Sequence, residues 1–540
     1  MGESSITGIL MDMPPTPKKL TGRAFYESIG SPKMILAPMV DRSEFAWRIL
    51  TRSYLEPEES KSLLAYTPML HSRLFKETAK FRDTHFQPTR DSLINHRASS
   101  SKPWLDGNPE IDRPLFVQFC SNDPEDLLDA ARYVAPYCDA VDLNLGCPQG
   151  IARSGHYGAF LQEDWSLIYK LINKLHEELS IPVTAKFRIL ESKERTLEYA
   201  KMILSAGASI ITVHGRRREQ KGHNMGLADW SYIRYLRDHL PSETVIFANG
   251  NILNRGDLQP CLDATGADGV MSAEGNLSDP TIFAVPPPPG LAVREYWRGE
   301  RGEEGYRIDA VIRRYLDIIY EYVLEEEPPR RQPLFVPLDP LDAEKQETSA
   351  EQHNNEGGPP KKKQKKDRHA KVLSPSLKAM QGHLFQMLRP MVSSHTEIRN
   401  ALAKCSAGDI PAFERVLTMI ENAVKQALLG EARKEVGEQL NEKAHDENPS
   451  GWKSTGAKAD TIATYKRPWW ICQPFIRPLP QQAKESGALT ASKKDIARMK
   501  NEGDKEDQGH IARVDGIESK QEGTATAPQN ELPKEALVCG

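Results

Sequence analysis

Short apolar runs, separated by longer segments with a helical spacing of apolar residues, dominate the chain between residues 31 and 285. Each run has four or five residues, which is typical of strands buried on both faces. The eight runs are 34–37, 63–66, 115–119, 140–143, 183–187, 210–213, 245–248 and 269–272. Strand and helix therefore alternate eight times over about 250 residues, a size and rhythm that predict a (β/α)8 TIM barrel over residues 31–290.

The main alternative for this part of the chain is a doubly wound parallel sheet. Such a sheet usually carries a Gly-x-Gly-x-x-Gly turn after its first strand, and none follows the run at 34–37. The barrel is therefore favoured. One interval, 84–112, has no periodicity, and we expect an inserted loop there.

The regions outside the barrel differ in composition. Residues 1–30 form a polar lead-in, and helical periodicity returns at 300–327 and 376–430, which predicts a smaller all-α domain. Residues 328–375 are too polar to fold alone, so we expect a disordered basic insertion. Its lysine run at 361–366 fits a nuclear localisation signal, a phosphate-contacting patch or a solvated linker. The tail, 431–540, is expected to be mostly disordered.

One cluster of aromatic and basic residues, at 465–478, interrupts the polar tail. Trp469, Trp470 and Arg477 could stack on nucleic-acid bases. The same residues could instead dock onto the body of the protein. The sequence leaves both interpretations open.

Composition narrows the class of protein. The chain has 540 residues, of which 39% are hydrophobic, and a net charge of −4. No apolar run is long enough for a membrane-spanning helix, and the N-terminus lacks the pattern of a secretory signal. The seven cysteines form no Cys-x-x-Cys pair, which excludes zinc ribbons and thioredoxin-type motifs. Few, scattered cysteines in a large chain are typical of a reduced, intracellular protein.

Polar residues and glycines follow nearly every predicted strand at its C-terminal end, where barrels carry their active sites. The segments are Pro38-Met39-Val40, Gln118, Asn144 to Pro148, Lys186 with Arg188, His214 to Arg216, Asn249-Gly250-Asn251 and Ala273-Glu274-Gly275. The last two are suited to binding phosphate through backbone N–H groups. A phosphate site near Lys186 and His214 indicates a phosphorylated cofactor, and a cation beside a reduced flavin would stabilise its negative charge.

Five of these segments together resemble the flavin-dependent tRNA-dihydrouridine synthases: 37–39, 144–148, 186–188, 213–216 and 249–251. Two more segments, 155–161 and 270–276, resemble the eukaryotic subfamily that acts at D-loop positions 16 and 17. Many family members have Gly-Arg in place of Ala273-Glu274, although that subfamily shares Ala-Glu. Gly150 stands where the subfamily usually has a larger residue.

The resemblance implies a barrel with a C-terminal helical domain, FMN as prosthetic group, NADPH or NADH as reductant and uridine in tRNA as substrate. It implies hydride transfer from N5 of reduced FMN to C6 of uracil, with Cys147 as the proton donor to C5. A free thiol, with a pKa of about 8.5, is mostly protonated at neutral pH and can serve as this acid. Cys120 and Cys138 lack such a motif and are expected to be structural.

Further roles follow from the same resemblance. Asn144, Arg188 and Arg216 would contact the substrate. The FMN-binding residues would be Pro38, Met39, Val40, Gln118, Lys186, His214, Asn249, Gly250, Asn251, Ala273 and Glu274. We further expect tRNA as partner, bound by the helical domain at 300–327 and 376–430. We expect no metal, no membrane, a monomer, and a place in the cytoplasm, the nucleus or both. The alternatives are an FMN barrel that reduces a free pyrimidine and an RNA-binding barrel without catalysis.

Overall fold

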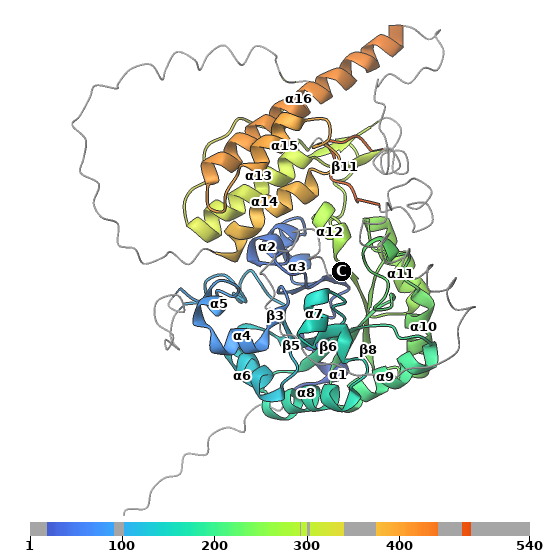
Figure 1. Cartoon of the computed structure of the whole chain (residues 1–540). Coiled ribbons are helices and arrows are strands. Elements are labelled where there is room, and N and C mark those ends of the chain that lie inside the picture. The colour runs from blue at the N-terminus through green and yellow to red at the C-terminus, as the bar shows by residue number, and fades with distance from the viewer. Residues whose placement is uncertain are drawn as a thin grey trace, which may run out of the picture.

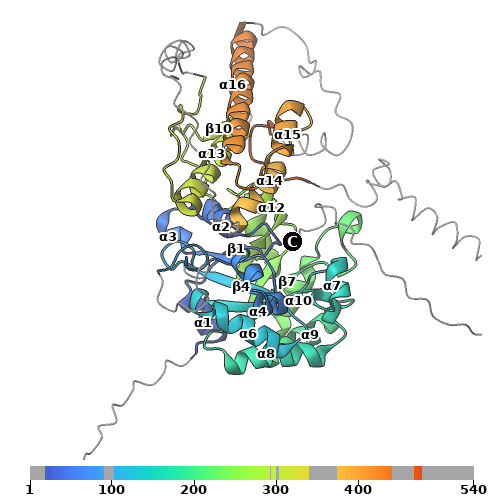
Figure 2. The same ribbon diagram turned by 60° about the vertical axis from the view of Figure 1, so that its left-hand side comes forward.

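The computed structural model describes residues 19–90, 102–291, 293–299, 303–337, 339, 374–440 and 467–476. Figures 1 and 2 show two parts, a barrel and a helical domain that sits over one end of it. Within these residues no helix is long and apolar enough to cross a membrane. The predicted lysine run at 361–366, with Lys466 and Arg477 of the tail cluster, lies outside the described residues.

Eight parallel strands form the barrel. They are β1 (Met34–Leu36), β2 (Leu63–Tyr66), β4 (Leu115–Cys120), β5 (Ala140–Leu145), β6 (Val183–Arg188), β7 (Ile210–His214), β8 (Val245–Asn249) and β9 (Gly269–Ser272). Pairing of β9 with β1 and of β2 with β4 closes the sheet. Every predicted run is a strand, and the TIM barrel is confirmed. A short extra strand, β3 (Leu70–His71), extends the pairing with β4 beyond the end of β2.

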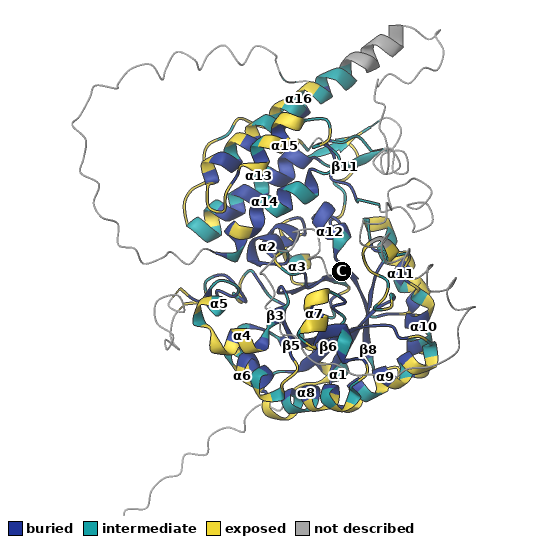
Figure 3. Cartoon of the chain, viewed as in Figure 1, coloured by how far each residue is buried: buried dark blue, intermediate teal, exposed yellow. Residues whose placement is uncertain are grey.

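Amphipathic helices surround the sheet, with buried residues facing the strands and exposed residues outward (Figure 3). Several begin at a side-chain N-cap, such as Asp123, whose carboxylate accepts two backbone N–H groups. The outer helices after β4 are α6 (Pro124–Val134), α8 (Trp165–Glu178), α9 (Lys193–Ser205), α10 (Trp230–His239) and α11 (Leu258–Thr265), and the short α7 (Gly150–Ser154) precedes α8.

The prediction of a polar lead-in at residues 1–30 is wrong for residues 22–28, which form a helix with two buried aromatic side chains. Helix α1 (Gly22–Ser28) buries Phe25 and Tyr26 in the core. The Tyr26 hydroxyl donates toward the carbonyls of Pro32 (3.2 Å) and Asp268 (3.1 Å), which precede β1 and β9. The helix therefore covers the N-terminal end of the barrel. Two apolar residues in one short helix gave too weak a periodicity to be recognised.

The inserted loop predicted at 84–112 is present, and its described parts, 84–90 and 102–112, contain no helix or strand. It is anchored by Arg48 of helix α2 (Phe45–Arg52). The Arg48 guanidinium donates to Asp106 (2.8 Å), to Asp112 (2.9 Å) and to the Ser43 carbonyl (2.8 Å). All of these groups are buried. Three short helices, α3 (Pro57–Ser60), α4 (Ser72–Glu77) and α5 (Ala79–Asp83), precede the loop.

The second part is the predicted helical domain. It begins with a hairpin of β10 (Tyr296–Arg298) and β11 (Glu304–Tyr306) and continues through α13 (Ile308–Ile318), the π-helical segment η6 (Ile319–Leu324), α14 (Pro375–Met387), α15 (Thr396–Ala403) and α16 (Ile410–Leu440). The first residues of the predicted insertion also belong to it. Leu334 is buried, and Arg331 pairs with Glu414 at 2.8 Å. The boundary predicted at 328 is therefore wrong.

The tail cluster docks on this domain. Residues 467–476 lie against β11 and α13, where the N–H of Ile308 donates to Trp470 (2.8 Å) and the N–H of Cys472 to Tyr306 (2.9 Å). Trp470 packs edge-on against Trp297 with 5.8 Å between ring centroids, and Ile471 is fully buried. Of the two interpretations left open by the sequence, the structure shows docking.

A buried contact joins the helical domain to the barrel. His383 of α14 stacks on Trp47 of α2 at 3.9 Å, and its Nε2 donates to Glu44 at 3.0 Å. Burial lowers the pKa of His383, so the ring is neutral at pH 7. Gln386 donates to Ser278 (3.1 Å) on α12 (Glu274–Ser278), the short helix after β9. The helical domain therefore braces the loop at the C-terminal end of β9.

Candidate active site

The residues predicted for the site gather at the C-terminal ends of the barrel strands, on the side that faces the helical domain (Figure 1). Gln118, Asn144, Lys186, Arg188, His214 and Asn249 lie in the strands themselves, within β4 to β8. The segments 38–40 and 273–274 follow β1 and β9, which are neighbours in the sheet. The closed barrel thus brings residues separated by over 200 positions in sequence to one rim.

The Cys147 backbone is held on two sides. The Asn144 side-chain oxygen accepts the N–H groups of Gly146 (3.1 Å) and Cys147 (2.9 Å), and the Cys147 carbonyl accepts the N–H of Ala159 (3.1 Å). Gly158 has a φ of +64°, and a Cβ there would lie 2.9 Å from the Cys147 carbonyl oxygen. These contacts fix the position of a cysteine that is only 2% exposed.

Asn144 was expected to contact substrate, and the structure also ties it to Gln118. The Asn144 amide nitrogen donates to the Gln118 side-chain oxygen at 2.8 Å. The Gln118 amide nitrogen donates in turn to Asp142 at 2.8 Å, and Thr184 donates to the other Asp142 oxygen at 2.6 Å. Burial raises the pKa of Asp142 to about 6, against the weaker effect of these hydrogen bonds.

Asp142 was missed in the sequence analysis. Its signal was a charged residue in the middle of an apolar run, flanked by Val141 and Leu143. A carboxylate seldom occupies such a buried position unless polar partners surround it.

Two basic side chains of β6 form hydrogen bonds across the barrel rim. The Lys186 ammonium donates to the Asn249 side-chain oxygen at 2.9 Å. The Arg188 guanidinium donates to the Gly146 carbonyl at 2.8 Å and to the carbonyls of Arg217 (3.2 Å) and Gln220 (3.3 Å). Arg188, which was expected to contact substrate, therefore also connects the loop after β5 with the loop after β7.

Arg216 joins two of the residues expected to bind cofactor. Its guanidinium lies 3.1 Å from His214 Nε2 and donates to the Asn251 side-chain oxygen at 3.0 Å. Burial, reinforced by Arg188, Lys186 and Arg216, lowers the pKa of His214 well below its ordinary value. A guanidinium can only donate, so Nε2 accepts and the single ring proton sits on Nδ1.

The turn after β8 requires glycine. Gly250 has a φ of +111°, and a Cβ there would lie 2.6 Å from the Ala228 Cβ. In helix α12, which follows β9, a Cβ on Gly275 would lie 2.3 Å from the Ile252 carbonyl oxygen. Ala273 is buried beside it, and Glu274 lies 3.9 Å from Arg389 of the helical domain. In the segment that follows β1, the Met39 N–H donates to Ser43 (2.9 Å), and Pro38 is buried while Val40 is partly exposed.

This set of side chains fits FMN. Lys186, Arg188 and Arg216 supply cationic donors beside a neutral imidazole, which suits a phosphate or an anionic ring. The paired amides of Gln118 and Asn144 offer the donors and acceptors that the polar edge of a flavin presents. Among the described residues, no group of three His, Cys, Asp or Glu side chains could hold a metal ion.

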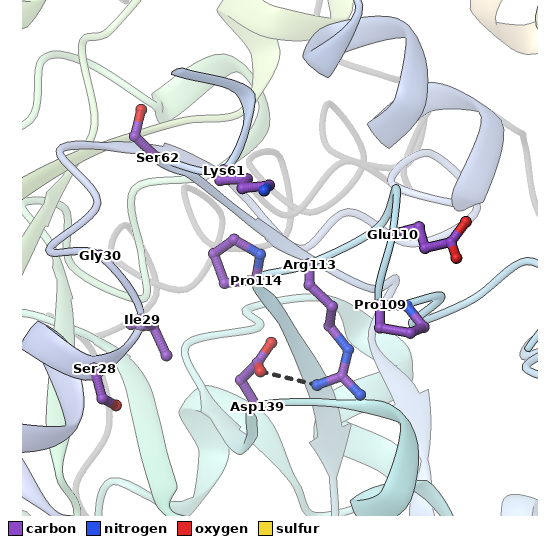
Figure 4. A pocket seen from close by; sticks show the side chains of 10 residues that line it. All are labelled: Ser28, Ile29, Gly30, Lys61, Ser62, Pro109, Glu110, Arg113, Pro114 and Asp139. Atoms are coloured by element: carbon purple, nitrogen blue, oxygen red, sulfur yellow. Dashed lines mark ion pairs between the residues drawn. The ribbon is translucent and has the colours of Figure 1, made fainter. Parts of the chain in front are cut away.

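A separate hollow of about 400 Å³ lies at the opposite end of the barrel (Figure 4). Ser62, Pro114 and Asp139, which precede β2, β4 and β5, help to line it. Arg113 there is paired with Asp139 at 2.9 Å. None of the predicted site residues lines this hollow, so it is distinct from the rim site.

Comparison with known proteins identifies the family of this chain. Residues 35–288 match the family described as "Dihydrouridine synthase (Dus)". A tRNA-dihydrouridine(16/17) synthase [NAD(P)(+)] of Schizosaccharomyces pombe is 44% identical over 463 residues, 86% of this chain and 92% of the relative. The Saccharomyces cerevisiae protein of the same name is 42% identical over 466 residues, 86% and 88% of the two chains. A Mus musculus relative, named as a tRNA-dihydrouridine(16/17) synthase [NAD(P)(+)]-like protein, is 34% identical over 478 residues, 88% and 75% of the two chains. The chain is therefore an oxidoreductase of the dihydrouridine synthase family and, within it, one of the tRNA-dihydrouridine(16/17) synthases.

Proposed function

We propose that this protein reduces the C5–C6 double bond of uridine at D-loop positions 16 and 17 of tRNA, with FMN bound at the rim and NADPH or NADH as reductant. The observation that carries the proposal is the Cys147 loop, fixed by Asn144 beside a rim of buried cations. The names of the relatives support tRNA as substrate, these positions and use of NAD(P).

When bound and reduced, FMN would supply the hydride that uracil receives at C6. The Cys147 Sγ–H donates the proton to C5, since a thiol is mostly protonated at neutral pH. Asn144 uses one amide N–H to reach Gln118 and has a second for the uracil edge. Lys186 and the Arg216–His214 pair would supply hydrogen-bond donors for the cofactor. Because Gly250 has no side chain, the protein backbone at this position could lie close to the cofactor.

A uridine stacked in folded tRNA must leave its stack to reach this rim. Basic side chains on the loop after β7 are placed to hold the RNA backbone outside the site. Arg217 and Lys221 of that loop are exposed. The Lys221 ammonium also donates to the Pro148 carbonyl (2.7 Å), which keeps this loop against the Cys147 loop.

The test is a dihydrouridine map. The purified protein is incubated with NADPH and tRNA that lacks dihydrouridine, and new sites are located by mass spectrometry. We expect products at positions 16 and 17 from the wild type and from the control Cys138→Ala, which removes a buried thiol far from the rim. We expect Cys147→Ala to keep its flavin and lose at least tenfold in rate.

Each other outcome has a definite meaning. Unchanged activity of Cys147→Ala would remove Cys147 as the proton donor. A protein that carries flavin and oxidises NADPH but leaves tRNA unmodified would move the free-pyrimidine alternative to first place. A protein that binds tRNA without flavin would favour the non-catalytic one.

A further inference from the structure

A continuous chain of hydrogen bonds leads from the barrel interior to the Cys147 loop. Thr184 donates to Asp142 (2.6 Å), and Asp142 accepts from Gln118 (2.8 Å). Gln118 accepts from Asn144 (2.8 Å), and Asn144 accepts the N–H of Cys147 (2.9 Å). Asp142, Gln118 and Thr184 are at most 1% exposed, and Asn144 is 4% exposed.

The two amides in this chain have no intrinsic direction. A side-chain amide can be turned by half a revolution, which exchanges its oxygen and its NH2 group with little change in shape. Turned about, Asn144 would present donors to the N–H groups of Gly146 and Cys147 and would repel the loop. Only one orientation of both amides therefore satisfies every hydrogen bond of the chain.

An ionised carboxylate can only accept hydrogen bonds. Asp142 therefore requires the NH2 group of Gln118 to point toward it, and this turns the Gln118 oxygen toward Asn144. The Asn144 NH2 group must then face Gln118, and its oxygen must face the backbone N–H groups of Gly146 and Cys147. The charge at one end and the two backbone N–H donors at the other thus require the same polarity of the bonds between them, and Asp142 adds its selection to theirs.

We propose that Asp142 is the positioning residue for the proton donor: through Gln118 and Asn144 it fixes the orientation in which the Cys147 loop is held. Asp142 does not touch the reacting atoms, and it acts only through this relay. The catalytic consequence of this relay rests on the proposed function. The effect of Asp142 on the Cys147 loop does not.

Three variants separate this role from ordinary packing. Asp142→Ala removes the acceptor and frees both amides. Asp142→Asn keeps one acceptor oxygen, which can face Gln118 if the Thr184 hydroxyl turns to accept the new NH2 group. Thr184→Val, the matched control, removes the other hydrogen bond to Asp142 and leaves the relay to Cys147 intact.

The first readout is the rate at which methyl methanethiosulfonate labels Cys147 in the flavin-loaded protein, followed by peptide mass spectrometry. We expect labelling at least fivefold faster in Asp142→Ala, an intermediate rate in Asp142→Asn, and less than a twofold change in Thr184→Val. The second readout is single-turnover reduction of tRNA uridine by the pre-reduced protein. It should fall at least tenfold in Asp142→Ala and be partly rescued in Asp142→Asn.

Equal labelling rates in Asp142→Ala and Thr184→Val would overturn the proposal, even if activity fell. If Asp142→Ala does not fold, Asp142→Asn decides alone: labelling no faster than in Thr184→Val overturns the proposal. If wild-type protein forms no dihydrouridine, the proposed function fails, and the labelling rates still test the relay.

Discussion

Lys186 and Asn249 lie on β6 and β8, with β7 between them, and their side chains meet in a hydrogen bond of 2.9 Å. The bond crosses the barrel rim beside His214, which ends β7. It therefore holds a cation near the His214 imidazole, whose pKa that charge helps to lower, at the place where the cofactor is proposed to bind.

Replacing Asn249 tests this arrangement. In Asn249→Ala the Lys186 ammonium loses the hydrogen bond that ties it to β8, so we expect flavin occupancy to fall several-fold. The measurement is the absorbance of bound flavin per mole of purified protein, with a titration of added FMN. Full occupancy and unchanged affinity would show that the bond does not position the cation for the cofactor.

The close packing of Gly158 on Cys147 leads to a second prediction. Gly158→Ala would place a methyl group 2.9 Å from the Cys147 carbonyl oxygen and 3.0 Å from its Cβ, at a φ of +64°. We expect the Cys147 loop to shift and uridine reduction to fall at least tenfold. The matched control is Gly150→Ala, because a Cβ at Gly150 meets nothing within 4 Å. Equal activities of the two variants would contradict the prediction.

A third prediction concerns Arg48, whose guanidinium is buried with Asp106 and Asp112. Arg48→Met leaves two buried carboxylates without their cation, which typically costs about 3–5 kcal/mol. Arg73→Met breaks an exposed pair with Glu77 and should cost less than about 0.5 kcal/mol. Urea denaturation at pH 7 measures both. A loss below about 1 kcal/mol for Arg48→Met would show that the loop at 84–112 does not depend on this cluster.

The raised pKa of Asp142 makes stability depend on pH. With a pKa of about 6 in the folded protein against 3.8 in the unfolded chain, folding favours the protonated acid. Its contribution is complete below pH 3.8 and is lost as pH rises through about 6. Wild type should therefore lose about 1 kcal/mol relative to Asp142→Asn between pH 5 and pH 8. The difference in free energy of unfolding between the two proteins, measured at both pH values, checks the sign.

The barrel could be predicted from sequence because its strands are buried on both faces and so form continuous apolar runs. Helix α1 and the hairpin of β10 and β11 were missed. The hairpin strands have three residues each, none of them fully buried, and such short half-buried strands leave little pattern. The attachment of 467–476 depends on contacts with residues far away in the chain, which no local pattern reveals.

Much of the site could also be predicted, since the ends of parallel strands must meet at one rim. The hydrogen-bond partners of the site residues could not be predicted. The sequence indicated that Asn144 and Arg188 belong to the site, but not that both hold the Cys147 loop. Asp142 lies on β5 two residues before Asn144, deeper in the barrel than the rim. Its link to the Cys147 loop is evident only from its hydrogen bonds in the folded structure.

The docked tail segment has a consequence for the order in which the protein can be completed during synthesis. The barrel closes once β9 pairs with β1, so all its strands are available after residue 272. Part of the start of the helical domain, at β11 and the first turn of α13, is covered by Trp470, Ile471 and Cys472, which come late in the chain. In a ribosome-bound chain the barrel could thus be folded while the surface of β11 and α13 that contacts residues 470–472 is still exposed. A release of the chain before residue 467 would leave an apolar surface on the helical domain exposed to other proteins.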